Sequence, residues 1–208
     1  MKARLFVSTL PEQRQHAGLE YADGFYCEAL DANLVTLPNV FSPDALDNGS
    51  RLLIDNLPRL EPASRTIDLA CGSGVIGLSA YRAGVTGNLL FCDESAMAVR
   101  SARENAARLF PQSVSDFSFF QGDGLAGYQG PAADLILCNP PFHLENAVDA
   151  FAGRRLLHQA GRHLGRGGRL CLVANRHLDY LPVLRRHFQR VQQLAQNRKF
   201  RVYLATKG

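Results

Sequence analysis

Residues 66–74 read Thr-Ile-Asp-Leu-Ala-Cys-Gly-Ser-Gly, and this stretch indicates which class of fold to expect. Residues 66–70 form a short, mainly apolar run of the kind that makes a buried strand. The glycines that follow permit a tight turn and a close approach of the backbone to a ligand. Residues 75–81 predict a helix directly after this turn. A strand, a glycine turn and a helix make the first half of a βαβ unit.

The same alternation of strand and helix continues to the end of the chain. Predicted strands cover residues 66–70, 88–92, 117–121, 133–138, 168–174, 191–195 and 200–206, and predicted helices cover 75–81, 95–109, 145–164 and 180–187. Such alternation predicts a mainly parallel sheet with helices on both faces. The last two strands, joined by a short polar turn, predict an antiparallel hairpin at one edge. We therefore expect an α/β fold with a seven-stranded sheet.

Two further elements are expected before this sheet. Residues 24–36 predict a β-hairpin, and Ser42 with Pro43 behind it predicts the start of a helix that runs to about residue 57. The 208 residues, 46% of them hydrophobic, suit one domain with a full core. We expect residues 37–208 to form that domain and residues 1–36 to be an N-terminal extension.

The composition indicates the cellular compartment of the protein. It contains no apolar run long enough to span a membrane, and its first residues do not make a signal peptide. Its five cysteines are scattered without a C-x-x-C pair, which is typical of small buried thiols. We expect a cytoplasmic protein that binds neither membrane nor metal.

Charge is distributed unevenly along the chain. Residues 154–208 hold 13 of the 23 Lys and Arg residues but only one of the 19 acids, so this part carries +12 and the rest −8. A basic segment of this kind within one domain favours an anionic partner, above all a nucleic acid, over a plain solvated surface. Six residues of this part are candidate RNA contacts: Arg155, Arg162, Arg166, Arg176, Arg198 and Lys199. Arg155, His158, Arg162 and Arg166 are spaced to form one helical stripe.

An acid or Asn closes four successive predicted strands, namely Asp68, Asp93, Asp123 and Asn139. Carboxyl ends of strands are where open α/β sheets bind ligands. Gly72, Gly74 and Gly77 fit a dinucleotide-binding pattern, but the Asp68 carboxylate would repel a pyrophosphate. The same carboxylate favours the ammonium and sulfonium groups of S-adenosylmethionine.

The predicted strand 133–138 stops at Asn139-Pro140-Pro141-Phe142, a loop that the two prolines make rigid. The Asn139 side-chain oxygen and the Pro140 carbonyl would each accept one N–H bond from a conjugated amine. Both bonds would aim the nitrogen lone pair at a methyl donor, while Phe142 would stack on the planar group. The loop therefore favours transfer of a methyl group to nitrogen.

Taken together, these motifs resemble the bacterial ribosomal-RNA guanine-N2 methyltransferases, most closely the large-subunit (23S) branch. The matching stretches are residues 38–42, Leu46-Asp47 with Gly49, residues 68–78, 93–95, 137–143, 173–180 and 199–200. The resemblance implies a class I, Rossmann-like methyltransferase domain, S-adenosylmethionine as cofactor, and guanine N2 of rRNA as target. It assigns Asn139, Pro140 and Phe142 to the target base. It assigns the following residues to the cofactor: Asp68, Ala70, Gly72, Gly74, Asp93, Glu94, Asp123, Gly124 and Asn139, with Phe41, Gly49 and Ser50 closing over it.

The chain departs from this family in two ways. Ala70 stands where the family usually has glycine. Family members usually carry a second, N-terminal domain that helps bind RNA, and at most some thirty residues precede the match here, so we expect either a catalytic fragment that lacks this domain or a different arrangement of RNA recognition. Two other functions stay open. One is methylation of a protein glutamine side chain, which also uses Asn-Pro-Pro-aromatic, and the other is a non-catalytic RNA-binding domain that kept the fold.

Overall fold

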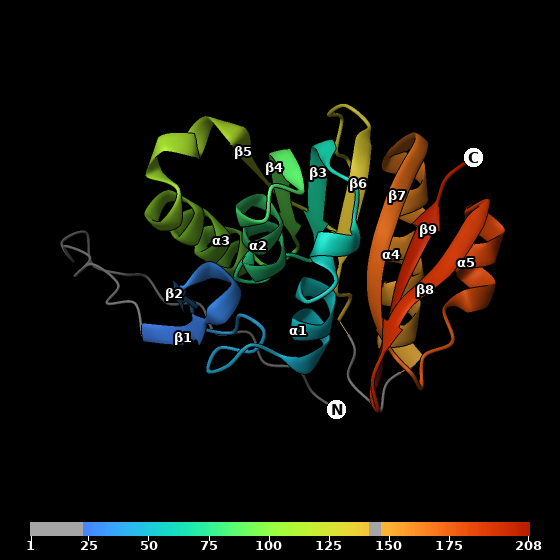
Figure 1. Cartoon of the computed structure of the whole chain (residues 1–208), viewed down its shortest axis with the longest axis horizontal. Coiled ribbons are helices and arrows are strands. Elements are labelled where there is room, and N and C mark those ends of the chain that lie inside the picture. Colours follow the sequence, from blue (N-terminus) through green and yellow to red (C-terminus); the bar gives the residue numbers. More distant parts are fainter. Residues whose placement is uncertain (1–22, 142–146) are drawn as a thin grey trace, which may run out of the picture.

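The computed structural model describes residues 23–141 and 147–208, which form a three-layer α/β arrangement around one large sheet (Figure 1). The sheet has seven strands in the order β5-β4-β3-β6-β7-β9-β8. Their bounds are β3 Ala63–Leu69, β4 Thr86–Asp93, β5 Phe117–Gln121, β6 Ala133–Cys138, β7 Leu164–Asn175, β8 Arg190–Gln196 and β9 Phe200–Thr206. Strands β3 to β7 are parallel, whereas β9 pairs antiparallel with both β7 and β8. The predicted sheet and its closing hairpin are confirmed.

Helices cover both faces of the sheet (Figure 1). Their bounds are α1 Asn48–Ile54, α2 Val75–Arg82, α3 Ala96–Leu109, α4 Ala147–His163 and α5 Leu181–His187. Because side chains alternate along a strand, Leu135 and Leu137 of β6 join the core under α1, α2 and α3. Ile136 and Cys138 of the same strand point the other way and join the core under α4 and α5.

The predicted N-terminal hairpin is present as β1 Asp23–Cys27 and β2 Ala32–Val35, an antiparallel pair outside the large sheet. Its apolar residues Phe25, Cys27, Leu30 and Leu34 lie in the same core as α2 and α3. The hairpin is therefore packed onto the α/β body, on the side of α2 and α3.

The helix predicted from Ser42 is wrong at its start. Ser42 has a left-handed φ of 54° and its hydroxyl donates to the carbonyl of Ala45, so it belongs to a turn. Helix α1 begins at Asn48 instead, because the Asp47 side chain caps it by accepting from the N–H groups of Gly49 and Ser50. The segment between β2 and α1 is consequently a loop that reaches over the end of the sheet.

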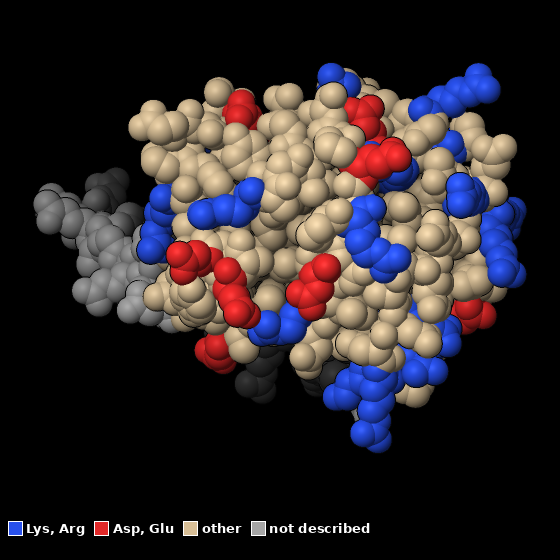
Figure 2. All heavy atoms as spheres, in the orientation of Figure 1, with Lys and Arg blue, Asp and Glu red and all other residues tan. Residues whose placement is uncertain are grey.

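Charge and polarity follow this architecture. Figure 2 shows Lys and Arg gathered on the side formed by α5, β8 and β9 and at the lower end of that side.

All five cysteines are buried free thiols, as the sequence predicted. None of the helices in the described part of the chain is long and apolar enough to cross a membrane.

Candidate active site

A cavity of about 580 Å³ opens where strands β3, β4 and β6 end at their carboxyl edge. These strands are neighbours, with Leu69 paired to both Cys92 and Cys138, so their ends lie at one level. Ten of the residues predicted to bind the cofactor or the target base line the cavity: Phe41, Ser50, Ala70, Gly72, Asp93, Glu94, Asp123, Gly124, Asn139 and Pro140. The fold thus brings together residues spread over a hundred positions of sequence.

The turn after β3 forms the floor of this cavity. Ala70, Gly72 and Gly74 all have left-handed φ angles, of 60°, 54° and 82°. A Cβ on Gly72 would meet no described atom within 4 Å, so at this position a ligand can approach the bare backbone. A Cβ on Gly74 would press against Ala102 and Phe91, so this glycine serves the packing of α2 and does not line the cavity. Ala70 holds a conformation that favours glycine, which explains the usual glycine of the family.

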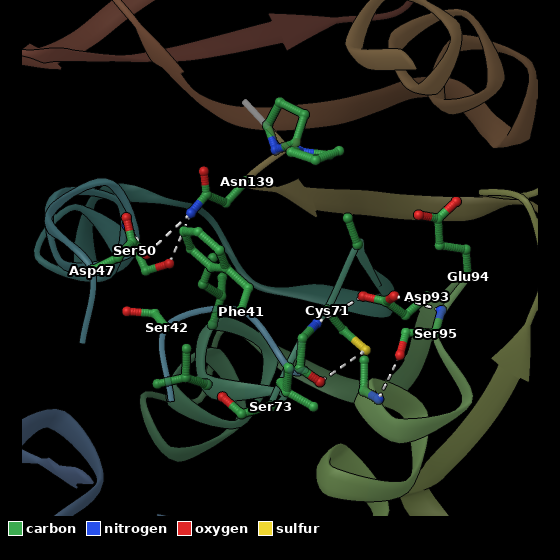
Figure 3. Close-up of a pocket in the computed structure, with 18 of the residues that line it drawn as sticks. Phe41, Ser42, Asp47, Ser50, Cys71, Ser73, Asp93, Glu94, Ser95 and Asn139 are labelled. Carbon is green, nitrogen blue, oxygen red and sulfur yellow. Dashed lines mark hydrogen bonds between the residues drawn. The ribbon is translucent and has the colours of Figure 1, made fainter. Parts of the chain in front are cut away.

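Asp93, at the end of β4, is held firmly in place. One carboxylate oxygen accepts from the Gly72 N–H at 2.9 Å and the other from the Ser95 N–H at 2.9 Å (Figure 3). A carboxylate oxygen can accept more than one hydrogen bond, so both oxygens retain capacity for hydroxyl groups of a ligand. Glu94 lies beside it on the cavity wall.

Asp68 is fully buried beneath the turn and does not line the cavity. Its Oδ2 accepts from the Gly77 N–H at 2.8 Å, and no described residue donates to its Oδ1. Burial raises the pKa of this carboxyl to about 8, an effect that the Gly77 N–H opposes and the Asp93 charge reinforces. A cation in the cavity would stabilise its ionised form.

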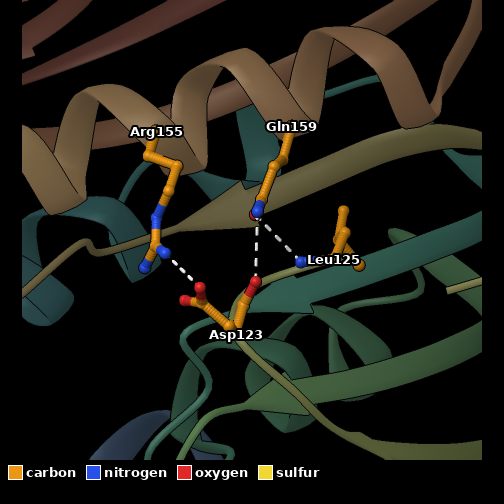
Figure 4. Close-up of polar contacts among 4 residues, drawn as sticks. All are labelled: Asp123, Leu125, Arg155 and Gln159. Atoms are coloured by element: carbon orange, nitrogen blue, oxygen red, sulfur yellow. Dashed lines mark hydrogen bonds and ion pairs between the residues drawn. The ribbon is translucent and has the colours of Figure 1, made fainter. Parts of the chain in front are cut away.

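Asp123 lies in the loop after β5, where it forms an ion pair with Arg155 of α4 (Figure 4). Gln159, one turn further along α4, donates to the Asp123 carbonyl at 3.1 Å and accepts from the Leu125 N–H at 2.9 Å. Arg155 therefore lines the cavity, which the other five candidate RNA contacts do not. Sequence spacing pointed to Arg155 as a surface cation, and nothing in the sequence pairs it with Asp123.

Asn139 presents its two polar atoms to different surroundings. Its amide nitrogen donates to Ser50 Oγ at 3.0 Å and to Asp47 Oδ2 at 3.2 Å, and its oxygen points away from both (Figure 3). That oxygen is buried and accepts no hydrogen bond from the described residues. Pro140 and Pro141 line the cavity next to it, whereas Phe142, the predicted stacking residue, lies outside the described residues.

The loop before α1 closes the cavity from the other side. Phe41 lines the cavity while 55% exposed, so an aromatic face stands at its mouth. Gly49 does not line it, because it packs inside α1 against Asp47 and Phe200. Asp47 was not among the predicted site residues, although Asp is one of the residues preferred at the start of a helix.

The basic residues divide between two edges of the sheet. Arg176 follows β7 at the cavity edge, and its N–H donates to the carbonyl of Lys199 in the β8–β9 turn beside Arg198. The predicted helical stripe is wrong at Arg166, because α4 ends at His163 and Arg166 lies in β7. Leu164 pairs with Ala133 at the amino end of β6, so Arg162 and Arg166 lie at the opposite edge. Across residues 23–141 and 147–208, no cluster of His, Cys, Asp and Glu could hold a metal.

A mainly parallel sheet with a glycine turn after β3, an acid at the end of β4 and Asn-Pro-Pro after β6 is the fold and site layout of a class I methyltransferase. The chain belongs to the family described as Methyltransferase small domain, whose model matches residues 31–204.

Similarity to proteins with curated names indicates which branch of this family the chain resembles. The chain is 42% identical over 206 residues to Ribosomal RNA large subunit methyltransferase G of Alcanivorax borkumensis, covering 97% of the chain and 50% of the relative. It is 38% identical over 207 residues to the protein of the same name from Pseudoalteromonas translucida, covering 100% and 54%. The resemblance to the large-subunit branch is thereby confirmed, and the chain spans about half the length of the curated relatives it matches.

A solved structure of similar fold carries ligands. It is the T. thermophilus 16S rRNA N2 methyltransferase (RsmC), in complex with AdoMet and guanosine. The two chains superpose with a TM-score of 0.71 at 25% identity, over 86% of this chain and 48% of the other.

Proposed function

We propose that this chain is the catalytic part of an enzyme that transfers the methyl group of S-adenosylmethionine to N2 of a guanine in 23S rRNA. The observation that carries the proposal is the Asn139 oxygen, a buried acceptor that no described residue satisfies, on a residue that lines the cavity floored by the glycine turn. The named relatives and the guanosine-bound neighbour support the choice of target. In this proposal residues 37–208 form the methyltransferase domain and residues 1–36 an N-terminal extension, in a cytoplasmic protein.

The cavity residues fit S-adenosylmethionine. Asp93 would accept from the ribose hydroxyls while Gly72 and Ala70 lie against the methionine part. Asp123 would accept from the adenine amino group, which must then share this carboxylate with Arg155. When bound, the cofactor supplies an electrophilic methyl group on a positively charged sulfur. That positive charge would favour the ionised form of buried Asp68, whose pKa burial raises to about 8.

The target amine would be held by acceptors of the loop after β6. A guanine amino group is a weak nucleophile because its lone pair is delocalised into the ring. Hydrogen bonds to the Asn139 oxygen and the Pro140 carbonyl would draw the nitrogen toward tetrahedral geometry and fix its direction. Phe142 would stack on the base, which must leave its helix to enter the cavity. The product is acidic enough to lose its proton to water, so the site requires no strong base.

RNA would approach across the edge that carries Arg176, Arg198 and Lys199. These side chains are exposed at the same edge of the sheet as Asn139, on the side where Figure 2 shows Lys and Arg gathered. Phosphate contacts of this kind position an RNA without reading its sequence. The curated relatives are about twice as long, and we propose that their additional half supplies further RNA binding.

The proposal is tested by cofactor binding and methyl transfer with one variant. Calorimetry should show S-adenosylmethionine binding to the wild-type chain, and labelled methyl groups should enter 23S rRNA from cells that lack this activity. Asn139→Ala should lower the rate of transfer by about 100-fold or more, to a residual rate, and should leave cofactor affinity within about threefold, because its oxygen would hold the amine. If the chain does not bind S-adenosylmethionine, the enzyme proposal fails in favour of a non-catalytic RNA-binding domain. If it methylates a protein glutamine and not 23S rRNA, the proposed target is wrong.

A further inference from the structure

We infer that Asp47 and Ser50 are positioning residues that hold the Asn139 side-chain amide in one of its two flipped orientations. In this orientation the oxygen faces the target and the nitrogen faces the protein. The inference rests on the proposed function. It explains why the Asn139 side chain offers its oxygen, and not its N–H groups, to the target.

The chemistry of Asp47 determines which end of the amide it contacts. A carboxylate only accepts hydrogen bonds, so the atom that faces it must be the amide nitrogen. The two N–H groups of that nitrogen are matched by two acceptors, Asp47 Oδ2 at 3.2 Å and Ser50 Oγ at 3.0 Å. Flipping the amide would place its oxygen against a carboxylate and leave the nitrogen without these partners.

Asp47 is itself prevented from turning away. Its Oδ1 accepts from the Gly49 N–H at 2.7 Å and its Oδ2 from the Ser50 N–H at 3.2 Å, which caps helix α1. Ser50 is 4% exposed within the first turn of that helix. The start of α1 therefore presents a fixed pair of acceptors to the end of β6.

Fixing the amide nitrogen of Asn139 also fixes the position of its oxygen. Asn139 lines the cavity, and its oxygen is left buried with no donor among the residues described. A buried acceptor without a partner strongly favours a ligand that supplies an N–H. A flipped amide would present N–H groups instead, and these would clash with the hydrogens of an amine. The clamp thus selects amino or amide nitrogen over a carbonyl oxygen.

Asp47→Asn is the decisive variant because capping dictates how the new amide sits. The new side chain has one oxygen for two capping N–H groups, and we expect it to keep the shorter bond, 2.7 Å to the Gly49 N–H, over the 3.2 Å bond to the Ser50 N–H. Its nitrogen then takes the place of Oδ2 and faces Asn139. Asn139 then turns its oxygen inward and its nitrogen toward the target. Turnover (kcat) should fall by up to about 100-fold, the loss that a small misplacement of a reacting group can cause. S-adenosylmethionine affinity should stay within twofold. Ser50→Ala, which keeps the carboxylate, should lower turnover less.

Controls separate positioning from stability. Asp179→Asn makes the same exchange at an exposed carboxylate that accepts from the Leu181 N–H at the start of α5 and does not line the cavity, so it should leave turnover unchanged. In an Asn139→Ala background, Asp47→Asn should cause no further loss of single-turnover rate. Additive losses in this double-mutant cycle, or full turnover of both Asp47→Asn and Ser50→Ala, would overturn the inference.

A second readout does not depend on activity. Nitrogen-15 NMR should show the Asn139 side-chain amide, identified by its disappearance in Asn139→Ala, as protected from solvent exchange in the wild type. This protection should be lost in Asp47→Asn, and unchanged protection would contradict the clamp. If the wild type transfers no methyl group, the proposed function fails while this spectrum still tests the clamp. If the wild type is active and the variants match it, the clamp alone fails.

Discussion

Asn105 of α3 joins three parts of the molecule that lie far apart in sequence, and its removal should destabilise the protein strongly. The side chain is fully buried. Its Oδ1 accepts from the Val35 N–H at 2.7 Å, and its nitrogen donates to the Val35 carbonyl at 2.9 Å and to the Ser73 carbonyl at 3.0 Å. One amide therefore ties the N-terminal hairpin and the glycine turn to α3.

The magnitude follows from the groups that Asn105→Ala would leave behind. Each buried polar group that loses its only partner costs about 1–3 kcal/mol. Three hydrogen bonds are lost, and Val35 and Ser73 are 7% and 4% exposed, so water gains little access to them. We expect a loss of about 3–5 kcal/mol, a large part of the roughly 5–15 kcal/mol that stabilises an ordinary domain.

Urea denaturation measures this loss directly. The matched control is Asn88→Ala, which removes an exposed amide with a single 3.4 Å bond to the Ser64 carbonyl and should change stability by no more than about 0.5 kcal/mol. A loss below about 1 kcal/mol for Asn105→Ala, with an unchanged denaturant slope, would refute the reasoning. The S-adenosylmethionine affinity should fall as well, since the Ser73 carbonyl belongs to the turn.

Three further predictions concern charge. The pKa of Asp68 is raised from 3.8 to about 8, so the folded state retains a proton that the unfolded state has lost. Stability should therefore fall as pH rises through this window, and Asp68→Asn should flatten the decline in melting experiments at pH 5 and 8.5; equal slopes would contradict this. Asp93→Ala should weaken S-adenosylmethionine binding about 100-fold in calorimetry, because ribose acceptors and the Gly72 contact are both lost; an unchanged Kd would remove Asp93 from the cofactor site. The double variant Arg198→Glu with Lys199→Glu should weaken RNA binding, and the slope of log affinity against log salt concentration should fall by about 0.7 per lost phosphate contact. Arg166→Glu, at the opposite edge of the sheet, should change neither quantity. Equal effects of the two changes would contradict an RNA-binding surface at the cavity edge.

Much of the candidate site could be predicted because it follows strand ends. Apolar runs show where strands stop, and parallel neighbours bring their carboxyl ends to one edge. Ala70, Asp93, Asp123 and Asn139 reached the cavity for this reason. Gly74 was placed correctly in the turn, but it packs against Ala102 away from the cavity.

Helix starts were harder to predict. Ser42 and Asp47 are both residues that cap helices, and local preference alone does not separate them. In the structure Asp47 is the residue that caps α1. Its carboxylate also accepts a hydrogen bond from the Asn139 side chain, which lies 92 positions further along the chain. The helical stripe failed at Arg166 because spacing cannot show that α4 ends at His163, where the chain turns into β7.

By itself, the amino-acid sequence determined the α/β class, the glycine turn, the acids at the strand ends and the Asn-Pro-Pro loop, because each depends on neighbours within a few positions. Only the tertiary structure decided which way the Asn139 amide faces, that Arg155 pairs with Asp123, and which basic residues share the edge of the cavity. Those contacts join segments about 20 to 90 positions apart. They form only when the sheet places the loops side by side, and local preference contains no information about that placement.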